Sequence, residues 1–313
     1  MSVPVSTEMF SVIGTDAGSM EAIARPSISF TKDAFNRLKK SKVAIVCTIV
    51  LLIIILGAIF IPMFTPYSYS EQNTGFSNKP MFSTDPITGN FYLFGTDELG
   101  RDIFTRVWYG ARTSMTVAVS VALIDCFVGV VYGGISGYFG GRTDTVMMRI
   151  LEIISGIPYL IIVILLMTVM NPGLTTIIVA YSLTGWTGMA RLVRGQVIGL
   201  KEQEFVIAAQ TMGASSSRII KRHLVPNILS VIIVNITLDI PSVIFTEAFL
   251  SLLGLGMPAP MSSWGVMAND GIKMFQMYPT QLAVAATFIC VTMLSFNLLG
   301  DQLRDAFDPK LRR

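Results

Sequence analysis

Long apolar runs recur along this chain from Val43 to Leu299, and each is long enough to cross the roughly 30 Å hydrocarbon core of a bilayer. Only 14% of the 313 residues are charged, against about 25% in a typical soluble domain, and 52% are hydrophobic. The runs do not alternate as the strands of a barrel would. The sequence therefore predicts an all-α integral membrane protein with six transmembrane helices, at residues 43–61, 113–135, 146–170, 174–193, 228–253 and 281–300.

Lysine and arginine are distributed unevenly about these six spans. If the residues before the first span are cytoplasmic, most of the 23 basic residues fall on the cytoplasmic side, and the exceptions are Lys79, Arg101, Arg106, Arg112 and Lys273. Because positive charge is retained in the cytoplasm, this pattern predicts that both termini are cytoplasmic.

The chain divides into three parts on these grounds. Residues 1–34 lack apolar periodicity and are expected to form a mobile cytoplasmic tail. Residues 35–110 hold the first transmembrane helix, an outer loop and a helix in the membrane interface, and residues 111–313 form a five-helix core that contains a cytoplasmic loop at 201–226.

The interfacial helix is predicted from the stretch FGTDELGRDIFTRVWYGARTSM, residues 94–115. Thr96 and Asp97 are good N-cap residues, the apolar residues after them share one helical face, and Gly110 is expected to turn the chain into the second span. Three nearby carboxylates, Asp97, Glu98 and Asp102, are considered as calcium ligands. The stretch lacks a D-x-D-x-D-G loop, so no metal site is predicted.

The cytoplasmic loop carries a compact polar insert, EFVIAAQTMGASSSRIIKRHLVPN, residues 204–227. Its first part favours a helix that ends at Gly213 in a left-handed cap. A second short helix at 218–224 is expected, with Pro226 separating it from the fifth span. Ala208, Ala209 and Gly213 give the first helix a face of small residues. That face can dock a partner or pack against the chain's own spans, and physical reasoning alone favours neither.

The insert resembles the cytoplasmic coupling loop of permease subunits of ATP-binding-cassette (ABC) importers. The general pattern there is Glu-Ala-Ala, three residues, Gly, nine residues, Ile, one residue, Leu-Pro. Residues in register are Ala208, Ala209, Gly213 and Pro226, and the departures are Ile207, His223 and Val225. Glu204 followed by the aromatic Phe205, and the ending RHLVPN, are similar to the oligopeptide and dipeptide permeases of that family.

Two further stretches carry the same resemblance. Residues 94–115 resemble the Gly-Thr-Asp, Leu-Gly-Arg-Asp and Gly-x-Arg signature of the peptide permeases. LSLLGLGMPAPMSSWGVM and LRDAFDPKLR resemble their last loop and C-terminal end. The similarity runs from about residue 35 to the end, and it indicates the C-type subunit, which has the larger outer segment after its first span.

The resemblance implies a type I importer fold in a prokaryotic cell membrane and half of a translocation pore for oligopeptides. The implied partners are a second homologous permease subunit, two cytoplasmic ATPase subunits and an outer solute-binding lipoprotein that delivers peptide. The sequence has no G-x-x-x-x-G-K-[ST] motif, so no cofactor is expected in this chain, and ATP and Mg²⁺ belong to the partners. The residues expected to couple to the ATPases are Glu204, Phe205, Ala208, Ala209, Gly213 and Pro226. We expect Gly213→Glu to insert normally and to abolish transport.

Ionisable residues within spans are functional candidates, because they are costly in lipid. Glu152 is expected to pair with Arg149 at helical spacing, and Asp125 to bond a neighbouring helix. The candidates for the translocation path lie in the fifth span around Pro241, and they are Asn235, Asp239 and Glu247.

Other residue types carry less information. His223 is the only histidine and lacks a metal-binding motif, so a capping or contact role is predicted. The cysteines, Cys47, Cys126 and Cys290, all fall in spans and are expected to be packed apolar residues. An intramembrane enzyme is disfavoured because no catalytic motif is present. A self-sufficient secondary transporter or channel remains an alternative, as do dipeptides or nickel chelates as substrate.

Overall fold

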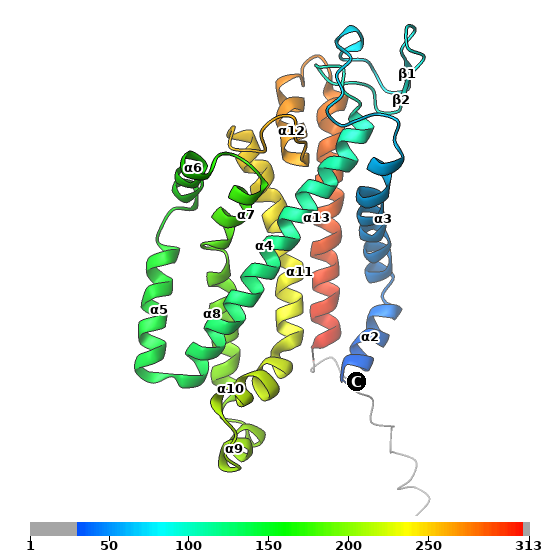
Figure 1. Cartoon of the computed structure of the whole chain (residues 1–313). Helices are drawn as coiled ribbons and strands as arrows, with labels where there is room; N and C mark the ends of the chain where they lie inside the picture. Colours follow the sequence, from blue (N-terminus) through cyan, green and yellow to red (C-terminus); the bar gives the residue numbers. More distant parts are fainter. Residues whose placement is uncertain (1–29, 309–313) are drawn as a thin grey trace, which may run out of the picture.

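A computed structural model describes residues 30–308 of the chain, so most of the predicted tail at 1–34 lies outside the described residues. The described part is a bundle of helices with a small hairpin at one end (Figure 1). That hairpin, β1 (Ser83–Thr84) paired antiparallel with β2 (Phe91–Tyr92), and the 3₁₀ turn η2 (Thr74–Phe76) lie in the predicted outer loop. The helices are α2 (Phe30–Lys40), α3 (Lys42–Phe64), α4 (Ile103–Phe139), α5 (Gly141–Ser155), α6 (Tyr159–Met170), α7 (Leu174–Ser182), α8 (Trp186–Leu200), α9 (Glu204–Thr211), α10 (Ser216–Ile219), the π turn η3 (Ile220–Leu224), α11 (Val225–Leu252), α12 (Trp264–Lys273) and α13 (Pro279–Phe307).

Among the described residues, four helical stretches are long and apolar enough to cross a membrane, and a fifth crossing results if the bent pair α5 and α6 counts as one. The four are α3, α4, the continuous stretch from α10 through α11, and α13. They contain the first, second, fifth and sixth predicted spans, which confirms helical structure for these runs.

The third and fourth predicted spans are not single helices, so this part of the prediction is wrong. Within 146–170, α5 and α6 meet at an angle of 73°. Pro158 lies at this break, where a ring without an N–H group cannot continue the hydrogen-bond ladder. Within 174–193, the chain leaves the helix between α7 and α8 and turns at Gly185, where a Cβ would lie 2.1 Å from Oδ2 of Asp125.

The predicted interfacial helix is also wrong. Helix α4 begins at Ile103 and continues for 37 residues through Gly110 without a turn. Its N-cap is Asp102, whose Oδ2 accepts a hydrogen bond from the Thr105 backbone N–H at 2.8 Å, instead of Thr96 or Asp97. Gly110 sits against the backbone of the loop before α12, and the glycine allows that close approach without breaking the helix.

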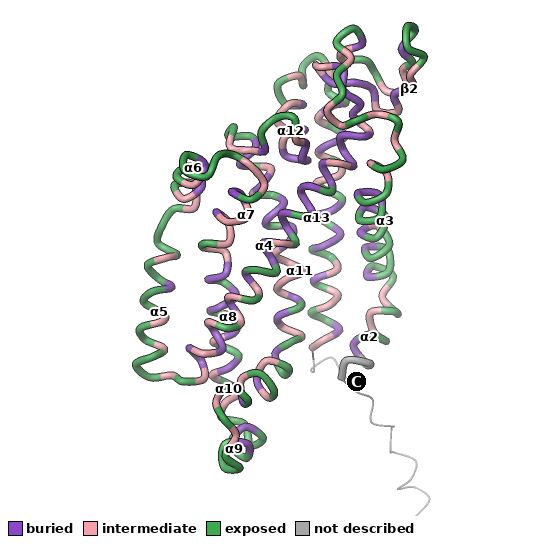
Figure 2. The backbone as a smooth tube through the Cα atoms, viewed as in Figure 1, coloured by how far each residue is buried: buried purple, intermediate pink, exposed green. Residues whose placement is uncertain are grey.

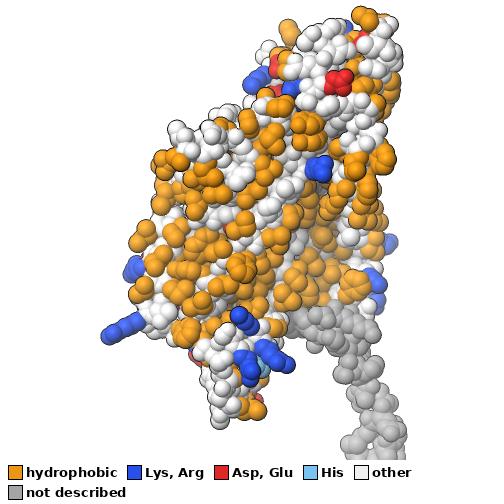
Figure 3. All heavy atoms as spheres, in the orientation of Figure 1, with side chains coloured by type: hydrophobic (Ala, Val, Ile, Leu, Met, Phe, Trp, Pro, Cys, Tyr) orange, Lys and Arg blue, Asp and Glu red, His pale blue; other side chains and the backbone are white. Residues whose placement is uncertain are grey.

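The core lies where α4 crosses the bundle. In Figure 1, α4 runs diagonally across the bundle, with its lower end near α8 and its upper end near α13. Figure 2 shows buried residues along the inner sides of α4, α11 and α13, while α5 and the tip at α9 are mostly exposed. Trp264 is fully buried, and its indole N–H donates to the Val107 carbonyl at 3.0 Å. The face of the bundle drawn in Figure 3 is largely apolar, and most of its charged side chains lie towards the two ends.

Helices α4 and α8 pack unusually closely through glycines on α4. Gly129, Gly133 and Gly137 are spaced four residues apart, and all three face α8. A Cβ on Gly133 would lie 2.3 Å from the Ala190 carbonyl oxygen, so the helix backbones are in direct contact. Small residues at four-residue spacing allow such contact in membranes, where packing replaces the hydrophobic effect as the main attraction between helices.

We predict that Gly133→Ala destabilises the protein by about 1–3 kcal/mol, the usual cost of overpacking a close contact. The matched control is Gly134→Ala, because its Cβ would meet only Ile220 Cγ2 at 3.5 Å. Both changes raise helix propensity by about the same 1 kcal/mol. Thermal unfolding of the two purified variants in detergent measures the difference, and equal midpoints would contradict the close contact.

Candidate functional site

The polar insert at residues 204–227 forms a projecting tip. Helix α9 lies beyond the ends of α5 and α8 in Figure 1 and is joined to α10 by a short turn. Val206 is fully buried and Ala209 is 9% exposed, and both belong to one apolar cluster with Ile219 and Leu224. The tip is therefore held to the bundle by one side of α9.

The opposite side of α9 is exposed and partly apolar. Phe205, Ile207 and Met212 are 41%, 49% and 87% exposed, and Glu204 and Ala208 lie among them. Ala208 and Gly213 are accessible to a partner, whereas Ala209 faces its own chain. One part of the small-residue face is therefore free to dock a partner, and the other part packs against the chain itself. An exposed apolar tip of this kind is typical of an interaction surface.

Gly213 ends the tip as the sequence predicts. It adopts a φ of +79°, its N–H donates to the Gln210 carbonyl at 2.9 Å, and the Ala214 N–H donates to the Ala209 carbonyl at 3.0 Å. This left-handed cap favours glycine for a conformational reason. Gly213→Glu would strain the backbone as well as change the surface, so that variant alone does not isolate docking.

Pro226 does not separate the insert from the fifth span, which corrects the prediction. The helix is continuous from α10 into α11, and Pro226 lies inside this stretch as the second residue of α11. The preceding residues widen into the π turn η3, in which the Val225 N–H donates to the Ile220 carbonyl. His223 lies in this turn, and its carbonyl accepts a hydrogen bond from Asn227 Nδ2. Pi turns inside helices often accompany functional sites.

Two polar contacts fasten the root of the tip to neighbouring helices. Arg194 of α8 binds Asp144 of α5 through two hydrogen bonds, and the second, from Nη2 to Oδ2, measures 2.6 Å. Lys201, at the end of α8, donates to the Gly137 carbonyl of α4 at 3.2 Å. Together with the glycine contacts, these bonds join α8 to α4 and α5 directly above α9.

The candidates for the translocation path are not equivalent. Asn235 Nδ2 donates to Asp239 Oδ2 at 2.8 Å, and both residues are half-buried. Asn235 also lines a cavity of about 360 Å³ between α8, α11 and the end of α13. Glu247, by contrast, is 2% exposed and lies inside the subunit.

Glu247 ties three segments together. Its carboxylate accepts hydrogen bonds from Ser114 of α4 at 3.1 Å, Ser251 of α11 at 3.2 Å and Ser263 of the loop before α12 at 2.6 Å. A buried carboxylate that three hydroxyl groups satisfy is a packing element, so this geometry argues against a place on the path.

The remaining residues within spans have separate environments. Asp125 is 4% exposed, and its Oδ2 lies against Gly185. Glu152 and Arg149 form an exposed ion pair at 2.7 Å, which confirms their predicted contact. The cysteines also differ, since Cys47 is buried but Cys290 is exposed.

An ion network that the sequence did not predict lies before and at the start of α4, at the end of the bundle away from the tip. Asp97 binds Arg101 at 2.7 Å and also Arg106, and the Asp270 carboxylate of α12 lies 3.4 Å from Arg106. Asp97 and both arginines are less than a tenth exposed. Asp97 and Arg101 lie in GTDELGRD, a stretch whose sequence pattern predicts a helix but which folds as a turn. Burial also raises the pKa of Asp102, the N-cap of α4.

Two glycines of the same stretch allow this turn to fold. Gly95 and Gly100 both have positive φ, and a Cβ on Gly100 would lie 1.8 Å from the Asn73 carbonyl oxygen. The residues of this stretch thus form a compact turn that packs on α4, α12 and α13. Gln281 of α13 completes it by donating to Asn78 at 2.9 Å and to the Thr96 carbonyl at 3.3 Å.

Comparison with known proteins identifies the family. Residues 129–313 match the family described as binding-protein-dependent transport system inner membrane component, and residues 29–80 match the N-terminal transmembrane domain of oligopeptide transport permease C. The chain belongs to this family of inner membrane permeases. Among its relatives, this permease is 51% identical over 99% of both chains to the oligopeptide transport system permease protein OppC of Bacillus subtilis.

Other relatives agree with this assignment. The permease is 52% identical to the dipeptide transport system permease protein DppC of the same organism, over 94% of this chain and 90% of that one. A solved structure of the MetNI methionine ABC transporter, in an inward-facing conformation, matches with a TM-score of 0.50 and 17% identity. It covers 63% of this chain and 94% of that one, which shows a shared fold.

We predict that Asp97→Asn destabilises the permease by about 3–5 kcal/mol, because it leaves the buried charge of Arg106 without its main counter-ion. Glu98→Gln is the matched control, since Glu98 is adjacent, half-buried and outside the network. Thermal unfolding of the purified variants tests this. A loss for Asp97→Asn no larger than for the control would contradict the role of the network.

Proposed function

We propose that this chain is the transmembrane permease subunit of an ATP-driven importer of oligopeptides. The observation that carries the proposal is its 51% identity, over 99% of both chains, to a permease of an oligopeptide transport system. The similar identity to a dipeptide permease keeps dipeptides as the second candidate. Nickel chelates are a third candidate, which rests on the resemblance alone.

The importer would be a heteromeric complex. This chain forms half of the pore and pairs with a second homologous permease, two cytoplasmic ATPase subunits and an outer solute-binding lipoprotein. ATP and Mg²⁺ bind to the ATPases, in keeping with the lack of a Gly-Lys pair in this sequence. The exposed apolar side of α9 supports docking of an ATPase at the tip.

The proposed topology has six crossings with both termini in the cytoplasm of a prokaryotic cell. It treats α5 with α6, and α7 with α8, as two broken crossings. Basic residues support this orientation. Arg218, Lys221 and Arg222 follow α9 closely in the sequence, and Lys and Arg side chains gather around the tip at one edge of the apolar band (Figure 3).

Coupling would proceed by rigid-body movement. Closure of the ATPase pair pushes on α9 through Glu204, Phe205, Ala208 and Gly213. Val206 and Ala209 pass this displacement to the bundle, and α8 carries it to α4 through the glycine contacts. Asn235 and Asp239 are the proposed residues of the translocation path, since they combine polarity with partial exposure at the depth of a span.

Peptide uptake tests this function. A strain that lacks the chain, with and without a plasmid copy, is supplied with a labelled pentapeptide, a labelled dipeptide or nickel. We expect the copy to restore pentapeptide uptake. Restoration of only dipeptide uptake, or of only nickel uptake, would identify dipeptides or nickel chelates as the substrate instead. Uptake by the chain alone, driven by an ion gradient without ATP, would indicate a secondary transporter.

We predict that Ala208→Glu reduces peptide uptake at least about tenfold at normal expression, because a bulky charge at a docking face costs more than about 1.4 kcal/mol. Ala208 is exposed and helical, so the change causes no backbone strain. Gln196→Glu adds the same charge to an exposed site on α8 and serves as the control. Co-purification of the ATPases is the second measurement, and normal uptake with normal ATPase recovery would remove α9 from the coupling surface.

A further inference from the structure

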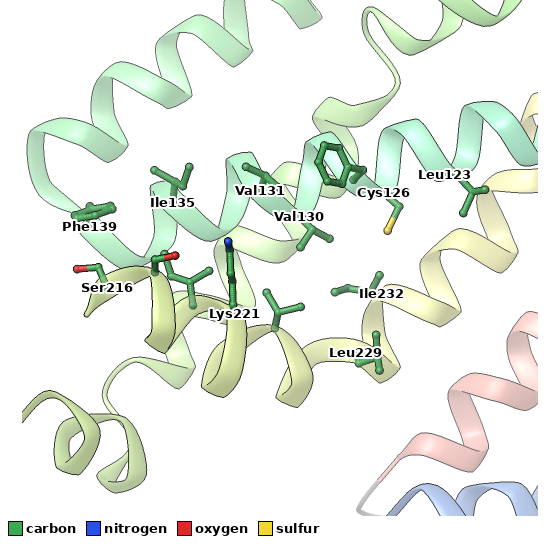
Figure 4. Close-up of a pocket in the computed structure, with 14 residues that line it drawn as sticks. Leu123, Cys126, Val130, Val131, Ile135, Phe139, Ser216, Lys221, Leu229 and Ile232 are labelled. Carbon is green, nitrogen blue, oxygen red and sulfur yellow. The ribbon is translucent and has the colours of Figure 1, made fainter. Parts of the chain in front are cut away.

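A long apolar groove runs along the outside of the bundle, between α4 and the stretch from α10 into α11 (Figure 4). Its volume is about 670 Å³. Apolar side chains line it from both helices, among them Phe127, Val131 and Leu229, which are 71%, 46% and 47% exposed. The groove therefore opens sideways from the bundle and is not an interior cavity.

The groove changes character at the end near the tip. Three polar residues, Ser216, Ser217 and Lys221, line it there, and Figure 4 shows the Lys221 side chain reaching from η3 into the groove towards α4. Within residues 30–308, Lys221 makes no ion pair. Arg218 and Arg222 add positive charge to the adjoining surface.

We propose that this groove binds an anionic phospholipid of the cytoplasmic leaflet. An acyl chain occupies the apolar part between α4 and α11, and the phosphate lies at Lys221, where the hydroxyl groups of Ser216 and Ser217 donate to its oxygens. The inference depends on the cytoplasmic placement of the insert that was proposed above.

The chemistry of the groove favours a lipid over a protein segment. An acyl chain matches a lining that is apolar over most of its length, and each buried CH₂ contributes to binding. A single cluster of donors and positive charge at one end matches one phosphate group. Basic pockets between membrane helices on the cytoplasmic side are known to bind anionic headgroups.

The position of the groove gives the lipid a role in coupling. Its polar end lies on α10 and η3, which connect the tip to α11, and its other wall is α4, which carries the glycines that contact α8. A bound lipid would bridge these two walls. Peptide transport should therefore be faster in membranes that contain phosphatidylglycerol than in membranes of phosphatidylcholine alone.

Lipid retention by the purified importer tests the proposal. The complex is exchanged into detergent with equal amounts of phosphatidylglycerol and phosphatidylcholine, and lipids retained on the permease are counted by native mass spectrometry. We expect wild type to retain more phosphatidylglycerol than phosphatidylcholine. In Lys221→Gln the ratio of the two retained lipids should fall about fivefold, which is the effect of removing one basic residue from a lipid surface. Leu229→Trp, which fills the groove, should reduce retention of both lipids.

Arg149→Gln is the matched control, because Arg149 carries the same charge on an exposed part of α5 and does not line the groove. It should keep the wild-type preference. An unchanged preference in Lys221→Gln, or loss of the second permease subunit instead of lipid in Leu229→Trp, would overturn the proposal. Recovery of the ATPases in the same preparation is scored separately, so a failure of the proposed importer assembly is distinguished from a failure of the lipid site.

Discussion

The backbone contact between α4 and α8 is the constraint on which the functional arrangement depends. Three glycines at four-residue spacing allow α8 to lie directly on α4, and the first residue beyond α8, Lys201, bonds to the carbonyl of the third glycine. Helix α9 follows within a few residues. Any side chain larger than hydrogen at Gly133 would push α8 outwards and displace the tip with it, so the position of the tip is set by packing inside the membrane.

This arrangement gives the insert two different attachments to the bundle. On one side, α8 is fixed by the glycine contacts and by the paired hydrogen bonds between Arg194 and Asp144. On the other, the tip continues into α11 through a π turn, in which the hydrogen-bond ladder is wider than in an α-helix. A push on α9 thus reaches α4 through the glycine contacts of α8 and reaches α11 through the π turn. The proposed lipid lies beside the second of these connections, between α4 and the stretch from α10 into α11.

The sequence predicted the parts of the fold that depend on composition and periodicity. Four of the six apolar runs are long helices, and the insert is a helix that ends at a left-handed Gly213. The failures arose where a local signal depends on tertiary contacts. Gly110 is predicted to turn the chain into the second span, but it lies inside one continuous helix, and its lack of a side chain allows the backbone before Trp264 to approach closely. Pro226 is predicted to interrupt a helix, but the helix runs through it, with the π turn η3 immediately before α11.

For the site residues too, the sequence identified polar side chains but not the residues that they contact. The sequence identified Glu247 as polar at membrane depth, but only the structure shows three serine hydroxyl groups around its carboxylate. It rejected a calcium role for the Asp97 carboxylate but named no other partner for it, and the structure pairs that group with two arginines. Spacing along one helix shows which residues share a face, but it does not show which distant segment satisfies them.

The two carboxylates of α11 differ in how fully the subunit satisfies them, and that difference bears on assembly. Glu247 has its hydrogen-bond partners within this chain and needs nothing further. Asp239 is half-buried and has one bond, from Asn235. A carboxylate with unsatisfied oxygens is costly against hydrocarbon, so this side of α11 has to face water or another polypeptide. A polar, incompletely satisfied face at this depth is what a subunit that forms half of an aqueous path requires, whereas a helix surrounded by lipid would bury or lose that charge.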